Sequence, residues 1–133
     1  MIVLDTHTLL WMDRDDVALG RQSRGFIEQA WATSSVAVSA ISFWESALLV
    51  QHGRIELPLA IETWRMDLLR AGIQEIVLDG QIALLACSLD YTPRDPADRF
   101  IIASALYHGA LLLTADSQIL NWKSNLERHD ARI

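Results

Sequence analysis

Four acidic residues stand where they could act together as one chemical site: Asp5, Glu45, Asp98 and Asp116. Two of them follow apolar runs that look like buried strands, at residues 2–4 and 110–114, and the other two fall in the first turn of a predicted helix. Carboxylates placed just beyond parallel strands converge on one edge of the sheet, where they repel one another. A cation among them would relieve that repulsion. The leading hypothesis is therefore a divalent metal site.

Each acid also has a purely structural interpretation as part of a helix cap. Asp5, Asp95 and Asp116 could each accept hydrogen bonds from the backbone N–H groups that begin the following helix. Glu45 stands three residues after Ser42, which is the spacing of a capping box. The two interpretations are compatible, because a carboxylate in a first helical turn can still point into a cleft. Asp95 is better explained as a cap that starts the helix presenting Asp98, which leaves it an outer role at the site.

Alternating strands and helices must position these acids. Apolar runs predict strands at residues 2–4, 35–39, 73–78 and 110–114, with a weakly signalled fifth at 131–133. Helical patterns are expected at residues 6–12, 21–32, 42–53, 58–71, 79–89, 95–109 and shortly after 116. This alternation predicts a single α/β domain over residues 1–133, with a central parallel sheet of about five strands and helices on both faces. Ligands of such sheets bind beyond the carboxyl ends of the strands.

Composition is consistent with one domain and leaves the partner open. The chain has 133 residues, 51% of them hydrophobic, and a net charge of −6. Negative charge argues against nucleic acid, yet part of it could belong to the site, where a bound cation would reverse its sign. Neither a targeting segment nor a membrane span is visible, so a cytoplasmic location is expected. The lone Cys87 is expected to be a core thiol.

Five stretches then match a known pattern in order along nearly the whole chain. They are Ile2-Val-Leu-Asp5-Thr-His-Thr-Leu-Leu-Trp11, Ser42-Phe-Trp-Glu45, Gly53-Arg-Ile-Glu-Leu-Pro58, Asp95-Pro-Ala-Asp98-Arg-Phe-Ile-Ile-Ala-Ser-Ala-Leu106 and Leu112-Leu-Thr-Ala-Asp116. Together they resemble PIN-domain ribonucleases, specifically the VapC-like toxins of bacterial toxin–antitoxin pairs. The resemblance implies a PIN-like fold and an endoribonuclease that hydrolyses RNA phosphodiester bonds with water activated by Mg²⁺ or Mn²⁺.

Carried over residue by residue, the resemblance implies that the catalytic and metal-binding acids are Asp5, Glu45, Asp98 and Asp116. Asp5 would be the central ligand, and Glu45 could act through a water molecule. The residues expected to support the site are Thr6, Asp95, Arg99 and Thr114. Arg99 could orient carboxylates or touch phosphate, although an ordinary surface or intrahelical pairing explains it equally well. His7 is expected to be packed or hydrogen-bonded locally.

The helix expected from Ser42 to Gln51 is apolar around most of its circumference, which allows two interpretations. It could be deeply buried, or a second molecule could cover its outer face. The resemblance implies an antitoxin peptide and a second copy of the chain as partners, giving a homodimer.

Two departures from the family pattern leave the substrate open. Related toxins often have His or basic residues where this chain has Thr92-Pro93-Arg94, and a basic or amide residue where it has Ala115. A housekeeping PIN-type nuclease would use the same acids. A non-catalytic regulatory module that binds a divalent cation is a further alternative. A phospho-acceptor receiver domain would need a lysine at a strand end, whereas Lys123 follows a short helix.

Overall fold

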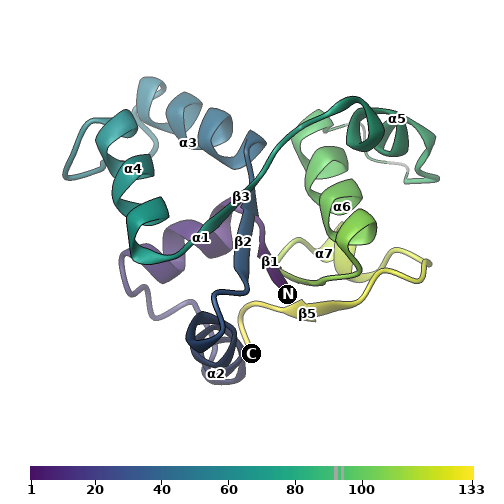
Figure 1. The fold of residues 1–133 in the computed structure, drawn as a ribbon, viewed down its shortest axis with the longest axis horizontal. Coiled ribbons are helices and arrows are strands. Elements are labelled where there is room, and N and C mark those ends of the chain that lie inside the picture. The colour runs from purple at the N-terminus through teal and green to yellow at the C-terminus, as the bar shows by residue number, and fades with distance from the viewer. Residues whose placement is uncertain (92, 94) are drawn as a thin grey trace.

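A five-stranded, entirely parallel sheet forms the centre of the molecule, in the order β3-β2-β1-β4-β5 (Figure 1). The computed structural model describes residues 1–91, 93 and 95–133. The strands are β1 (Ile2–Leu4), β2 (Val36–Ser39), β3 (Gln74–Ile76), β4 (Leu111–Thr114) and β5 (Arg128–Asp130). The predicted α/β class with a parallel sheet is therefore confirmed.

Helices cover both faces of this sheet, as the alternation of elements predicts. They are α1 (Thr6–Asp13), α2 (Arg21–Ala32), α3 (Ile41–Gln51), α4 (Ile61–Ala71), α5 (Gly80–Ser88), α6 (Pro96–His108) and α7 (Ser117–Leu120). Side chains alternate between the faces of a strand. Ile2 and Leu4 of β1 accordingly pack with α1, α2 and α4, whereas Val3 packs with α5, α6 and α7. In the part of the chain that the structure describes, no helix is long and apolar enough to cross a membrane.

The fifth strand lies at Arg128–Asp130, three residues earlier than the predicted strand at 131–133. Those last residues instead turn onto the start of α2, where the Ile133 carbonyl accepts hydrogen bonds from the N–H groups of Gln22 and Ser23. The sequence signal misleads because β5 is a polar, half-buried edge strand, whereas the apolar residues sit in the segment after it.

Two helix starts also differ from the prediction. Helix α4 begins at Ile61 rather than Pro58, because Ala60 is still extended. Helix α3 begins at Ile41, one residue before Ser42, and the Oγ of Ser39 accepts a hydrogen bond from the N–H of Ile41.

Cys87 is exposed, so the prediction of a core thiol is wrong. Helix α5 turns only Ile82 and Ala86 fully into the core, and Cys87 lies on the other side of the helix beside solvent.

Candidate functional site

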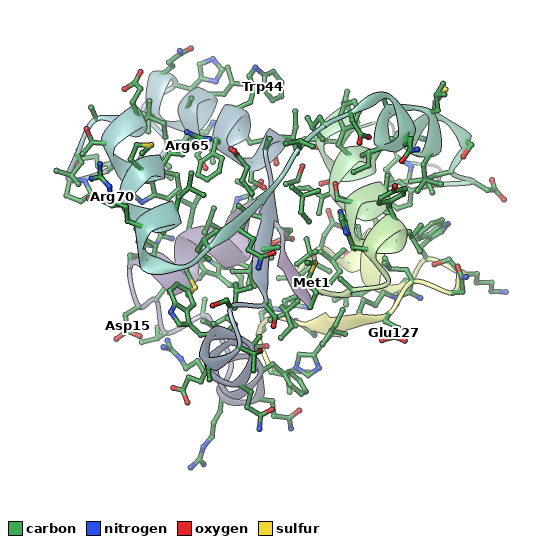
Figure 2. All side chains as sticks on the ribbon, in the orientation of Figure 1. Met1, Asp15, Trp44, Arg65, Arg70 and Glu127 are labelled. Carbon is green, nitrogen blue, oxygen red and sulfur yellow. The ribbon has the colours of Figure 1, made fainter. Side chains whose placement is uncertain are left out.

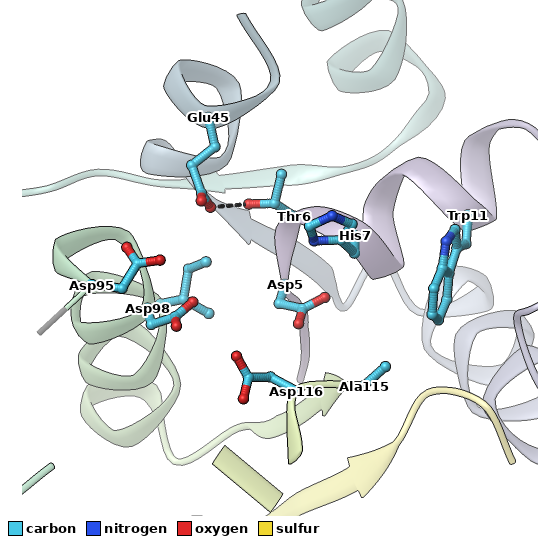
Figure 3. A pocket seen from close by; sticks show the side chains of 10 residues that line it. Asp5, Thr6, His7, Trp11, Glu45, Asp95, Asp98, Ala115 and Asp116 are labelled. Carbon is cyan, nitrogen blue, oxygen red and sulfur yellow. Dashed lines mark hydrogen bonds between the residues drawn. The ribbon is translucent and has the colours of Figure 1, made fainter. Parts of the chain in front are cut away.

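The four predicted acids line one cavity at the carboxyl ends of β1 and β4 (Figure 3). The cavity has a volume of about 270 Å³, and Asp95 lies on its wall as a fifth carboxylate. Asp5 follows β1, Asp116 follows β4, and Glu45 and Asp98 come from helices α3 and α6. Residues that are far apart in the sequence therefore meet where the predicted topology requires them to meet.

Asp5 is the most buried of these acids and is held by both of its carboxylate oxygens. Its Oδ1 accepts a hydrogen bond from the N–H of Thr8 at 2.9 Å, which caps α1. Its Oδ2 accepts a hydrogen bond from the Oγ1 of Thr114 at 2.5 Å. Burial raises the pKa of Asp5, and these two donors oppose that rise by stabilising the charged form. Thr114 therefore contacts Asp5 directly, through a hydrogen bond that the sequence does not reveal.

Glu45 faces the cavity and is joined to helix α1. The hydroxyl of Thr6 lies 2.5 Å from Oε1 of Glu45 and 3.0 Å from the Oγ of Ser42. The capping-box interpretation of Ser42 and Glu45 is therefore wrong, since the helix begins before Ser42 and the carboxylate binds Thr6. Burial raises the pKa of Glu45, and the negative charge of Asp95 raises it further. Thr6 lines the cavity and contacts Glu45 there.

Asp95 and Asp116 are helix caps that also line the cavity. Oδ1 of Asp95 accepts a hydrogen bond from the N–H of Ala97, with Pro96 at the start of α6. Oδ1 of Asp116 accepts hydrogen bonds from the N–H groups of Gln118 and Ile119. Both residues therefore cap a helix and also face the cavity.

Asp98 carries the clearest electrostatic sign of crowding. It is half-buried in the first turn of α6, and burial raises its pKa from 3.8 to about 7. Four neighbouring carboxylates contribute to the same rise: Asp95, Asp116, Glu45 and Asp5. Nearby negative charges disfavour the ionised form of Asp98, so ionising it in the folded protein costs free energy of folding.

Arg99 pairs with no carboxylate among the described residues and binds backbone carbonyls instead. Its Nη1 donates hydrogen bonds to the backbone carbonyls of Ala86 and Leu89, at 3.0 and 3.2 Å, and its Nη2 donates to that of Tyr91. Arg99 therefore ties the end of α5 and the following segment to α6, the helix that carries Asp98. Positioning that helix is its contribution to the site.

His7 and Trp11 line the cavity as well, from helix α1. The expectation that His7 is packed locally is wrong, because its side chain is exposed. The sequence position of His7, two residues after Asp5, could have predicted its place at the cavity, because the first turn of α1 begins there. The departure from the family pattern at Thr92 and Arg94 lies outside the described residues. Ala115, the other departure, lines the cavity without a polar group.

The donor set suits a hard divalent cation. Carboxylate oxygens crowd the cavity, and Mg²⁺ and Mn²⁺ prefer such ligands together with water. Within residues 1–91, 93 and 95–133, however, no three acidic, His or Cys side chains already stand in ligand geometry. Both oxygens of Asp5 and one of Asp116 bind hydrogen-bond donors instead. The residues fit the ion by their chemistry.

Comparisons with known proteins agree with this fold. The model of the PIN domain family matches residues 2–123, so the chain belongs to the PIN-domain family. Ribonuclease VapC22 of Mycobacterium tuberculosis is 32% identical over 119 residues, which cover 89% of this chain and 88% of that protein.

Solved structures share the fold at lower identity. VapBC2 from Rickettsia felis, bound to a DNA fragment from its promoter, has a TM-score of 0.69 at 15% identity, covering 97% of this chain and 98% of the other. A toxin–antitoxin complex from Klebsiella pneumoniae has a TM-score of 0.64 at 20% identity, with 95% of each chain covered.

The crowded carboxylates predict how the stability of the metal-free protein depends on pH. A carboxyl whose pKa rises on folding stays protonated in the folded state while the unfolded chain has already ionised. Stability should therefore fall as the pH rises from about 4 to about 7. With a chelator at pH 8, we expect Asp98→Asn to raise the free energy of unfolding by about 1–3 kcal/mol, allowing for partial solvation.

Urea denaturation at pH 4 and pH 8 measures this difference, and the gain should disappear at pH 4. Glu28→Gln is the matched control, because it removes an exposed carboxylate of α2. Equal effects of the two substitutions at pH 8 would contradict the electrostatic interpretation of the cavity.

Proposed function

We propose that this protein is a divalent-metal-dependent endoribonuclease and the toxin of a toxin–antitoxin pair. The observation that carries the proposal is the convergence of Asp5, Glu45, Asp98 and Asp116 on one cavity at the carboxyl edge of the sheet. The 32% identity to a protein named as a ribonuclease supports RNA as the substrate. A cytoplasmic location follows from the proposal, because such a toxin would meet its RNA there.

The acids of the cavity have different roles toward the metal in this proposal. Asp5, Asp98 and Asp116 would hold Mg²⁺, or Mn²⁺ in its place, and Glu45 would reach the ion through water. When bound, such an ion acts as a Lewis acid toward phosphoryl oxygens and water.

The supporting hydroxyls fix the carboxylates. Thr114 and the N–H of Thr8 hold Asp5 in one orientation, and Thr6 aims the carboxylate of Glu45 into the cavity. Preorganised carboxylates of this kind can orient a water molecule for attack on a phosphodiester.

Binding of the metal should be visible as thermal stabilisation. We expect Mg²⁺ or Mn²⁺ to raise the melting temperature of the wild type, because the cation removes the repulsion among the carboxylates. The rise should be much smaller for Asp5→Asn, which loses the central ligand. Differential scanning fluorimetry with and without EDTA measures both shifts. Equal shifts for the two proteins would refute the metal site.

Expression in a bacterium separates a toxin from the alternative functions. We expect the wild type to arrest growth and its purified form to cleave RNA in a reaction that EDTA stops. Asp5→Asn and Asp116→Asn should do neither while accumulating to the same level as folded protein.

Two other results would point elsewhere. Metal-dependent cleavage without growth arrest would favour a housekeeping PIN-type nuclease. Metal binding without cleavage would favour the non-catalytic regulatory module.

An antitoxin is the first proposed partner, and the structural neighbours, which are toxin–antitoxin complexes, support it. The outer side of α3 and α4 supports it as well. Val50 and Met66 are exposed there, and so is Leu59 between the two helices. Deep burial of α3 does not occur, since that helix fully buries only Ser42, Phe43 and Ser46.

A second copy of the chain is the other proposed partner, through the surface formed by Val77, Leu84 and Tyr107. These side chains are 63%, 75% and 50% exposed. Val77 and Tyr107 line one depression, and the Tyr107 hydroxyl donates a hydrogen bond to Gln81, one turn before Leu84. Exposed apolar side chains gathered in this way commonly mark an interface.

Sedimentation velocity tests this interface. We expect a dimer for the wild type and a monomer of 15.0 kDa for Leu84→Glu, because burying a charge at an interface is costly. Leu59→Glu places the same charge on the α4 side and should remain dimeric. A monomeric wild type at every accessible concentration would disprove the homodimer.

A further inference from the structure

A second cavity continues from the acidic one along the outer side of helix α3. Its volume is about 230 Å³, and it shares His7 and Glu45 with the acidic cavity. We call it the α3 groove, and the other residues that define it here are Trp44, Leu48, His52 and Arg54. A polymer bound across the acidic cavity would therefore pass into the α3 groove at His7 and Glu45.

The α3 groove offers a flat aromatic surface to solvent. The side chain of Trp44 is 54% exposed and projects from the surface of the molecule (Figure 2). It precedes Glu45 on α3, so one helix supplies a carboxylate to the acidic cavity and an indole to the groove beside it. His7, on the side of the groove nearest the acids, is likewise exposed.

Arg54 is one of the few cations whose charge is still available to a ligand. Most arginines already bind partners within the protein: Arg14, Arg24, Arg65, Arg70 and Arg132 form ion pairs, and Arg99 and Arg128 donate to backbone carbonyls. Over residues 1–91, 93 and 95–133, only Arg21, Arg54 and Lys123 form neither an ion pair nor a side-chain hydrogen bond. Of these three, Arg54 lies in the groove next to the acids.

We propose that the α3 groove binds the single-stranded RNA next to the scissile phosphate, with a base stacked on Trp44 and a phosphate contacting Arg54. The proposal rests on the proposed ribonuclease function and names where its substrate is held. The acidic cavity repels the phosphates that flank the cleaved bond, so neighbouring nucleotides need a cation and an apolar face close by. Base stacking on an aromatic side chain and phosphate contact by arginine are the usual means of holding single strands.

A protein could also cover Trp44, as a peptide or a second copy of this chain. RNA is favoured because the groove continues into the cavity of the carboxylates and carries an unpaired arginine, and RNA brings the complementary charge.

Binding of a fluorescein-labelled single-stranded RNA of mixed sequence, measured by anisotropy in EDTA, tests the proposal. The RNA should be about 10 nucleotides long, within the ~4–16 that such grooves accept. We expect Trp44→Leu to weaken binding by about 5- to 150-fold, the usual range for loss of one stacked base, and Trp44→Phe to keep most of the affinity.

Arg54→Gln tests the phosphate contact separately from the stacking contact. It should weaken binding and lower the slope of log affinity against log salt by about 0.7, the value for one phosphate contact on a single strand. Arg21→Gln is the matched control, because it removes an unpaired arginine from the start of α2 and should change neither quantity. In cleavage assays with Mg²⁺, Trp44→Leu and Arg54→Gln should raise KM and leave kcat nearly unchanged, as loss of uniform binding predicts.

Three outcomes would overturn the proposal, and they differ in what else they affect. If the wild type cleaves RNA and the groove variants match it in affinity and KM, the groove is not part of the RNA site, although the proposed function stands. If Trp44→Leu changes the sedimenting mass but not the RNA affinity, the groove is an interface between copies. If the wild type neither binds nor cleaves RNA, the proposed ribonuclease function fails together with this inference.

Discussion

Repulsion among five carboxylates in one cavity is the constraint on which the rest of this structure depends. Burial raises the pKa of Asp98, and the negative charges of the other four acids raise it further: Asp5, Glu45, Asp95 and Asp116. A fold that only needed stability would gain from neutral residues at these positions. The supporting contacts therefore have to hold the acids in place against the repulsion. A divalent cation would bind more tightly at this cavity because it would relieve that repulsion.

The sheet and its helices meet this constraint with short-range contacts. Three of the five acids also cap helices, so backbone N–H groups offset part of their negative charge: Asp5, Asp95 and Asp116. Two threonines add hydroxyl donors, from Thr6 to Glu45 and from Thr114 to Asp5. The same donors bind oxygens that a metal would use, and no three acidic, His or Cys side chains stand in ligand geometry within the described residues.

The sequence located the acids because an apolar run indicates a buried strand directly, and the alternation of strands and helices predicts that the strand ends share one edge of a sheet. Asp5 and Asp116 follow strands whose residues are almost entirely buried. It failed where a residue's partner lies far away in the chain. Glu45 binds Thr6 rather than its own helix start, and Arg99 binds the carbonyls of Ala86 and Leu89 across two helices. Pairings of this kind are set by tertiary packing, and local spacing carries no trace of them.

The net charge of −6 becomes compatible with an RNA substrate once the charges are followed individually. Ion pairs already engage the cations Arg14, Arg24, Arg65, Arg70 and Arg132, so these contribute little to any ligand. Much of the negative charge is concentrated at the cavity, where a cation would neutralise it. Binding would then depend on a few local groups, Trp44 and Arg54 first among them, rather than on a broadly basic surface. A ribonuclease of this kind would select its RNA through the groups next to the acidic cavity, because its net negative charge would repel nucleic acid elsewhere on the surface.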